Sequence, residues 1–177
     1  LDGANVIGGS KILVTVGKES VLLDFGMNFK VFSSYFEEYL RPRSSRGLKD
    51  LFTIGLLPPL ADFYREDLFP NDLQKEDFTL NRNIVGIFLS HAHADHTGCI
   101  GYVKSEIPLY STSITVKILE VLQKITKSDF ARDCFSFKEK ALCDDGLAIK
   151  GDRSSSRITR NLVELNNKNF QIGDICC

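Results

Sequence analysis

Short apolar runs alternate along this chain with stretches of helical periodicity. The runs at residues 11–16 and 20–24 flank the short turn 17–19, so together they predict a β-hairpin. Residues 84–89 (Ile-Val-Gly-Ile-Phe-Leu) are apolar and partly β-branched, which is typical of a buried strand. Residues 107–110 predict a further strand. Four strands are thus expected before residue 111.

Two segments carry apolar residues at helical spacing. Between residues 31 and 40 an aromatic stripe predicts a helix with these side chains in the core: Phe32, Tyr35, Phe36, Tyr39 and Leu40. The sequence Ser111-Thr112-Ser113 offers caps for a second helix, along one face of which lie Ile114, Ile118, Val121, Leu122 and Ile125. From residue 84 onward the order is strand, turn, helix, strand and helix, so the sequence predicts an α/β fold.

The remaining segments are less regular. Residues 55–83 hold three prolines and several polar clusters, which predict a long connection with short helical turns and no separate domain. Within it, Tyr64 and Arg65 are compatible with substrate contact, core packing or surface exposure. Residues 143–160 are linker-like, and residues 161–172 predict another hairpin.

Composition narrows the class of protein. The chain has 177 residues, 43% of them hydrophobic and 25% charged, as expected for a globular domain with a real core. Its net charge of −1 gives no overall attraction for nucleic acid, so any such binding depends on a local basic patch. The 5 cysteines are odd in number and form no C-x-x-C pair, which favours a reducing compartment. Because we find no signal peptide and no membrane-spanning run, we expect a cytoplasmic protein without membrane contact.

All 3 histidines of the chain lie in one heptapeptide, Ser90-His91-Ala92-His93-Ala94-Asp95-His96. Imidazole and carboxylate groups are the usual protein ligands of zinc. His91 and His93 leave the same face of extended backbone, so they are placed to chelate one ion. Asp95 and His96 follow after the chain turns, which directs them to a second ion. A pair of such ions activates water for attack on phosphorus or a carbonyl carbon.

The hexad H-x-H-x-D-H resembles the signature of the metallo-β-lactamase superfamily. Residues 20–29, a strand ending in Asp24-Phe25-Gly26, look like the first motif of that superfamily. The Gly-rich opening at residues 3–11 is similar to the nucleic-acid-processing branch, which includes ribonuclease J and other β-CASP nucleases, and residues 41–68 look like a ribonuclease J relative. The resemblance covers roughly residues 3 to 125 and implies a four-layer αββα sandwich, of which only the N-terminal part is present.

The resemblance also implies a function. It implies a zinc-dependent phosphodiesterase acting on RNA or single-stranded nucleic acid, with two Zn²⁺ ions in the intact enzyme and Mn²⁺ as an alternative. One ion would be held by His91 and His93, the other by Asp95 and His96. Asp95 would also be catalytic, holding or accepting the proton of the attacking hydroxide. Asp24 would support the metal loop (residues 90–96) through hydrogen bonds.

The ligand set is incomplete within the chain. The superfamily pattern continues with a His, an Asp and a further His, but no histidine follows His96. We therefore expect residues 1–177 to be a partial metallo-β-lactamase domain, truncated at both ends, that is inactive by itself.

Three arginines suggest a substrate contact. Arg41, Arg43 and Arg46 lie in one loop, where their guanidinium groups suit phosphate oxygens. The alternative is a solvated helix end that favours cations. A second basic run, Lys150, Arg153, Arg157 and Arg160, is expected to be a solvated surface.

Rival functions stay open at this level. A thioester or lactone hydrolase of glyoxalase II type would use the same metal chemistry, and an inactive binding module would need none of it. The arginine loop favours phosphate. The sequence does not decide whether the substrate is RNA or DNA, or whether cleavage is endo- or exonucleolytic. It also leaves open the presence of a β-CASP cap, the identity of the remaining metal ligands and the oligomeric state.

Overall fold

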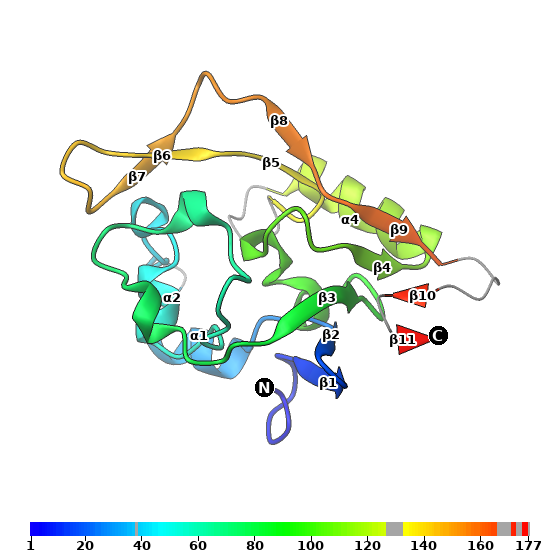
Figure 1. Cartoon of the computed structure of the whole chain (residues 1–177). Coiled ribbons are helices and arrows are strands. Elements are labelled where there is room, and N and C mark those ends of the chain that lie inside the picture. Colours follow the sequence, from blue (N-terminus) through cyan, green and yellow to red (C-terminus); the bar gives the residue numbers. More distant parts are fainter. Residues whose placement is uncertain (38, 127–132, 166–170, 173–174, 177) are drawn as a thin grey trace.

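A mixed sheet organises the molecule. The computed structural model describes residues 1–37, 39–126, 133–165, 171–172 and 175–176 (Figure 1). Its main sheet has the order β1-β2-β3-β4-β9, with strands Ile12–Val16, Glu19–Leu23, Asn83–Phe88, Leu109–Ser111 and Leu162–Glu164. β1 and β2 form the predicted antiparallel hairpin, and the other neighbours are parallel. The predicted α/β class is confirmed.

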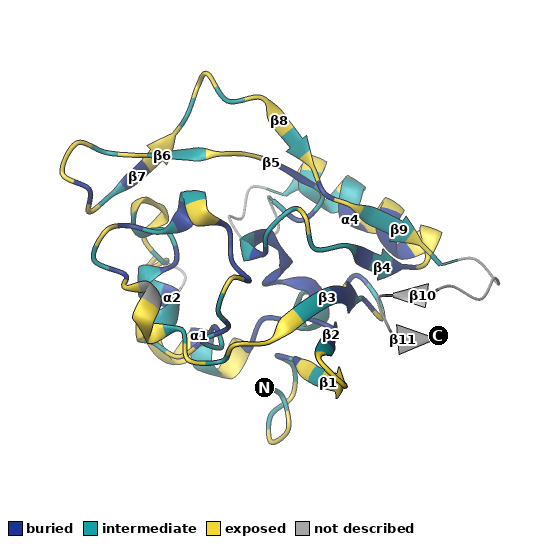
Figure 2. Ribbon diagram, in the orientation of Figure 1, coloured by how far each residue is buried: buried dark blue, intermediate teal, exposed yellow. Residues whose placement is uncertain are grey.

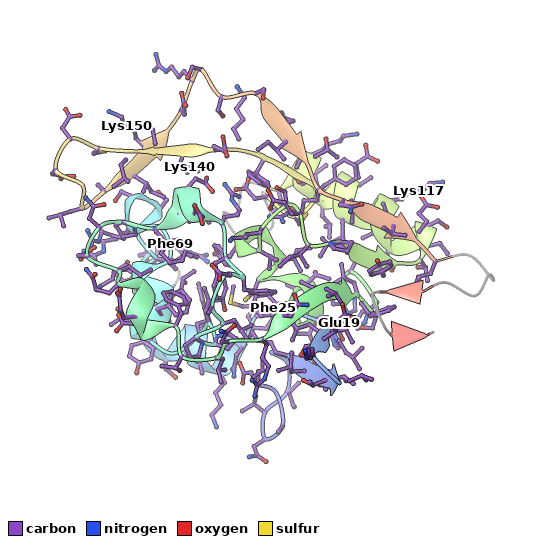
Figure 3. The ribbon with its side chains drawn as sticks, viewed as in Figure 1. Glu19, Phe25, Phe69, Lys117, Lys140 and Lys150 are labelled. Carbon is purple, nitrogen blue, oxygen red and sulfur yellow. The ribbon has the colours of Figure 1, made fainter. Side chains whose placement is uncertain are left out.

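One face of this sheet supports the core. Leu22, Ile87 and Leu109 lie in register on β2, β3 and β4, and all three are fully buried. Beside them Phe25 packs edge-on against Phe63, with ring centroids 5.1 Å apart, near the middle of the molecule (Figure 3). Figure 2 shows that buried residues gather around β2, β3 and β4, whereas the hairpin of β6 (Lys140–Leu142) and β7 (Ile149–Gly151) is mostly exposed or half-buried. The strands β2, β3 and β4 are therefore anchored to a packed core, which fixes the position of their carboxyl ends.

The first helix, α1 (Phe29–Tyr35), is shorter than the aromatic stripe predicts. It starts at Asn28, whose side chain accepts a hydrogen bond from the Val31 backbone N–H at 3.1 Å, and the chain becomes extended at Phe36. Phe32 is buried, but the residues predicted to continue its stripe are exposed: Tyr35, Tyr39 and Leu40. The prediction of a core stripe is wrong for these three. Tyr35 is the last residue of the helix and lies on its exposed side, and Tyr39 and Leu40 follow after the helix has ended.

The second predicted helix is α4 (Ser113–Ile125), and Thr112 caps it by accepting the Thr115 N–H. Its orientation differs from the apolar pattern. The helix buries Val116 and Leu119, whereas four residues of the predicted apolar face are exposed: Ile114, Ile118, Val121 and Ile125. The helix also contacts the tail, because the Gln123 side chain accepts the backbone N–H groups of Phe135 and Ser136.

The long connection contains the predicted short turns. It holds the 3₁₀ turns Glu66–Leu68 and Lys75–Asp77. The helix α2 (Lys49–Thr53) and the turn Ser44–Arg46 come before it. Tyr64 and Arg65 are both buried, so core packing is the correct one of the three interpretations. The Tyr64 hydroxyl donates to the Pro58 carbonyl at 2.5 Å, and burial raises the pKa of this phenol far above its usual range.

The tail forms small two-stranded sheets. β5 (Ser136–Lys138) pairs with β8 (Arg157–Thr159), β6 (Lys140–Leu142) with β7 (Ile149–Gly151), and β10 (Gln171–Ile172) with β11 (Ile175–Cys176). The predicted hairpin over residues 161–172 is wrong, because β9 adds to β4 and β10 pairs with β11. Its predicted turn, residues 166–168, lies outside the described residues.

Arg160 departs from the predicted solvated surface. Its side chain is buried, whereas Lys150, Arg153 and Arg157 are exposed as expected. The guanidinium donates to the backbone carbonyls of Gly101, Val103 and Asp133, all at 2.8 Å, so the tertiary structure supplies acceptors that the local sequence does not indicate. Across the described residues, every helix is too short or too polar to cross a bilayer.

Candidate metal centre

The histidine hexad follows β3, at the carboxyl end of the parallel strands. Leu89 continues the strand by donating its N–H to the Tyr110 carbonyl at 2.8 Å. After Ser90 the chain turns, and the short helix α3 (Ala94–Thr97) starts at His93, whose carbonyl accepts the N–H groups of His96 and Thr97. The predicted turn from strand to helix is therefore present, with the ionisable side chains at the edge of the sheet.

Three of the four predicted ligands converge. His91, Asp95 and His96 each offer a ligand atom, and these atoms all lie within 4.8 Å of one another. The rings of His91 and His96 are 4.0 Å apart between centroids, and His96 Nε2 is 3.4 Å from Asp95 Oδ2. All three residues are half-buried, so they remain accessible to an ion from solvent.

His93 lies at the side of this group. Its ring centroid is 4.7 Å from that of His91, and the residue is exposed. His93 is outside the set of mutually close ligand atoms. The ligand atom of His91 therefore groups with those of Asp95 and His96, whereas the sequence predicts that His91 and His93 chelate one ion together.

Asp24 lies directly behind the rings. Its carboxylate accepts hydrogen bonds from the Ser90 N–H at 2.8 Å and the Ser90 hydroxyl at 2.9 Å, and its Oδ2 lies 2.7 Å from His96 Nδ1. Its backbone has a positive φ of 59°, an uncommon conformation for a residue with a side chain. Asp24 therefore occupies the position from which a carboxylate can orient a ligating imidazole.

Ser90 belongs to the site through its hydroxyl group, a role that the sequence did not predict. Its oxygen lies 2.9 Å from His91 Nδ1 and 3.3 Å from His96 Nδ1, besides its bond to Asp24. With both δ nitrogens engaged, the ε nitrogens of the two rings are left for a metal ion. The only signal in the sequence is the place of Ser90 between the strand and the first histidine.

Two segments that contain glycine, residues 3–11 and residues 20–29, enclose the metal loop. The backbone N–H groups of Phe25 and Met27 donate to the carbonyls of His96 and Ala94, at 2.8 and 2.9 Å. Ser10 donates its N–H to the Asp95 carbonyl at 3.0 Å. The Gly-rich opening, the Asp24 segment and the hexad, which are far apart in sequence, therefore meet at one place.

Close backbone contact explains the glycines in these segments. A Cβ at Gly26 would lie 1.6 Å from the Asp95 carbonyl oxygen, and a Cβ at Gly8 would lie 2.9 Å from the Asp95 Cβ. Gly8 also has a φ of +86°, which favours glycine. Only glycine allows both segments to approach Asp95 this closely.

A buried ion pair anchors the opening segment. The fully buried Lys11 ammonium lies 3.0 Å from Asp2 Oδ2, and the Asn28 side-chain amide donates to Asp2 Oδ1 at 2.9 Å. Burial alone would raise the pKa of Asp2, but the hydrogen bond and charge of Lys11 outweigh it and hold the pKa below its usual range. The segment before β1 is thereby fixed to the start of α1.

Cys99 lies just beyond the metal loop but has a different character. It is fully buried, and its thiol donates to the Gly26 carbonyl at 3.2 Å. Burial raises the pKa of this thiol to about 11, so it stays protonated at neutral pH. A neutral, enclosed thiol is a packing residue, and the candidate ligands remain nitrogen and oxygen.

The arginine loop is separate from this cluster. Arg43 forms a bidentate ion pair with Asp50 at 2.7 and 3.0 Å, which raises the pKa of the guanidinium, and Arg46 pairs with Asp72 at 2.5 Å. Arg41 is exposed. In Figure 1 this loop lies beside α2, on the side where β3 begins, whereas the hexad follows the end of β3. The structure does not bring the three arginines to the metal loop.

Part of the chain matches a known protein family. Residues 68–133 match the Metallo-beta-lactamase superfamily, and this span contains β3, the hexad, β4 and α4. The resemblance inferred from the motifs is therefore confirmed. The mixed sheet that carries the metal loop is consistent with the metallo-β-lactamase fold.

More specific relatives are distant. The chain is 25% identical over 121 residues to ribonuclease J of Helicobacter pylori, in strains that include B128 and J99. This match covers 67% of the chain but only 13% of the relatives' length. In structure, the chain is similar to a protein of unknown function from Enterococcus faecalis V583, with a TM-score of 0.61 and 22% identity, over 99% of this chain and 35% of that one. This likeness concerns the fold alone.

Proposed function

We propose that this chain forms the first half of the metal centre of a zinc-dependent hydrolase, a phosphodiesterase that acts on RNA. The observation that carries the proposal is the convergence of His91, Asp95 and His96 within 4.8 Å, backed by Asp24 and Ser90. The similarity to ribonuclease J supports RNA as substrate. On this proposal, residues 1–177 are part of a larger metallo-β-lactamase domain.

The donor set fits zinc. Three imidazoles and one carboxylate lie on a single loop, and nitrogen-rich sets of this kind favour Zn²⁺ over Mg²⁺, with Mn²⁺ as the alternative. His91, Asp95 and His96 would hold the first ion, with His93 turning in beside His91 or serving a second one. A bound zinc ion makes water a nucleophile at neutral pH.

The residues of the chain have distinct tasks in this scheme. Asp24 and Ser90 fix the ring orientation of His96 and His91 through their δ nitrogens. Asp95 has its carboxylate beside His96 Nε2, where it would hold or accept the proton of the attacking water. The ligands that complete two metal shells are proposed to come from beyond this chain, since a bare hexad supplies at most four donors.

A thioester or lactone hydrolase of glyoxalase II type is the rival function. It uses the same activated water, so the metal loop cannot separate the two chemistries. The likeness to ribonuclease J favours the phosphodiester, whereas the arginine loop no longer does, because Arg43 and Arg46 are paired with Asp50 and Asp72.

Zinc binding and substrate turnover test this proposal separately. We expect the Asp95→Asn variant of the chain to bind zinc about 10- to 100-fold more weakly than the native chain in a competition titration with a chromophoric chelator. In the intact protein the same variant should lose hydrolysis of 5′-monophosphorylated RNA. Asp62→Asn is the matched control, because Asp62 is a highly exposed carboxylate outside the metal loop. Turnover of a thioester panel without turnover of RNA would refute the nuclease assignment.

A further inference from the structure

A second candidate site lies between the end of α4 and the strand β5, away from the metal loop. A cleft of about 560 Å³ is lined by α4 on one side and by residues of β5, β6 and β8 on the other. Four of its lining residues are basic: Lys124, Lys138, Lys140 and Arg157. The half-buried ring of Phe135 lies among them. In a chain with a net charge of −1, this is a local concentration of positive charge.

The walls of the cleft are held in place by Gln123 on α4. Its side-chain oxygen accepts the backbone N–H groups of Phe135 and Ser136, at 2.6 and 2.9 Å. Its amide nitrogen donates to the Ser136 carbonyl. Arg157 on β8 donates to the Ser136 hydroxyl at 2.9 Å, which orients the guanidinium along the wall. Hydrogen bonds within the protein therefore fix the walls of the cleft.

The acidic residues of the cleft are already engaged. Glu120 pairs with Lys124 at 2.7 Å, and Asp133 pairs at 2.8 Å with Arg65, which belongs to the buried interior. Within the described ranges, Lys138, Lys140 and Arg157 form no ion pair. Their charges are thus available to an external anion.

Two of these cations lie close together in sequence. Lys138 ends β5 and Lys140 begins β6, and both line the cleft, whereas Glu139 between them does not. Figure 3 shows Lys140 where the ribbon passes from β5 to β6. Such a row of cations beside an aromatic ring is suited to a flexible polyanion with bases that stack.

The cleft is remote from the hexad. α4 begins next to the metal loop, where the Ser111 hydroxyl donates to the Leu89 carbonyl at 2.8 Å, and the cleft lies at its other end. A helix of 13 residues is about 20 Å long. A ligand in the cleft would not reach the reacting atoms.

From these observations we infer that the cleft binds the phosphate backbone of single-stranded RNA at nucleotides distant from the bond that is hydrolysed. The inference rests on the proposed function for its choice of RNA. Lys138, Lys140 and Arg157 contact phosphates, and Phe135 offers a face for one base. The site would retain the strand and would not take part in the chemistry.

RNA binding without turnover is the direct test. The full chain is titrated in EDTA into a fluorescent oligouridylate of about 15 nucleotides, and anisotropy is followed from about 0.05 to 0.3 M salt. The variant Lys138→Gln/Lys140→Gln/Arg157→Gln should bind about 10-fold more weakly at 0.1 M salt, with a salt slope shallower by about 2. Lys18→Gln/Lys30→Gln/Arg82→Gln removes the same charge from exposed positions elsewhere and should bind like the native chain.

Each other outcome counts against the inference. Equal weakening in both triple variants, native affinity in the cleft variant, no binding by the native chain, or preferential binding of polyglutamate would overturn it. If the triple variant unfolds, Lys138→Gln/Lys140→Gln leaves the Arg157 bond to Ser136 intact and must still weaken binding. Because EDTA removes catalysis, a protein that binds RNA here yet cleaves only thioesters would refute the proposed function and leave RNA binding by the cleft standing.

Discussion

Ser90 places one hydroxyl between two imidazoles and a carboxylate. Hydroxyl groups both donate and accept, so the Ser90 oxygen can donate to Asp24 while it accepts from a protonated δ nitrogen of His91. A ring fixed in this way presents its ε nitrogen in a single direction. Orientation by such outer partners commonly changes metal affinity 10- to 100-fold.

We therefore expect Ser90→Ala to weaken zinc binding by about 10-fold, because the δ nitrogen of His91 loses its partner. The measurement is a competition titration of the isolated chain, without any substrate. Ser33→Ala is the control, since the exposed Ser33 hydroxyl bonds the Lys30 carbonyl of its own helix. Affinity within twofold of the native chain would contradict the orienting role of Ser90.

At the scale of elements, the metal loop is held by backbone contacts from two other segments. The Asp24 segment bonds the carbonyls of Ala94 and His96, and Ser10 bonds that of Asp95. The loop is therefore bounded by peptide groups on two sides, and the packing leaves no space at Gly26.

Gly26→Ala should destabilise the protein by about 3 kcal/mol or more, because the added methyl group would overlap the Asp95 carbonyl and force the two segments apart. Urea unfolding measures the loss, and zinc affinity should fall with it. Gly151→Ala is the matched control: a Cβ there meets nothing within 4 Å, so its stability should stay within about 0.5 kcal/mol of the native value. Equal midpoints for the two variants would disprove the close contact.

At the scale of the whole molecule, two buried arginines join the tail to the body. Arg65 pairs with Asp67 and Asp133 and stacks on the Phe137 ring at 3.5 Å. Arg160 binds carbonyls of both the body and the tail. Burial, with the positive charge of Arg65 as the second cause, lowers the pKa of Arg160 to about 9. Because this value still lies above neutral pH, the guanidinium stays charged there.

Arg160→Met should lower the free energy of unfolding by about 2 to 4 kcal/mol, because buried carbonyl groups lose their charged donor. Hydrogen exchange should rise first in β5 and β8, which this side chain holds to the body. Arg153→Met, at an exposed position of the same tail, should leave both quantities unchanged. Uniform exchange rates in Arg160→Met would contradict this anchoring role.

Local patterns predicted the parts of the fold that depend on near neighbours. The hairpin of β1 and β2, the strand β3, the turn that follows it and the capped helix α4 all come from runs of fewer than 15 residues. The predicted face of α4 was wrong because Ile114, Ile118, Val121 and Ile125 satisfy the helical period without having a surface to pack against. The extent of α1 and the pairing of β9 also depend on distant partners.

For this protein the sequence alone determined the candidate donors of the metal loop, since three histidines and an aspartate in one hexad need no tertiary information to be proposed as ligands. The tertiary structure decided which donors converge, and it brought Ser90 and Asp24 behind the rings and buried Arg65 and Arg160. The physical reason is that ligand type is a property of the side chain. Orientation and burial are properties of the surroundings, and those come from segments that lie far apart in the chain.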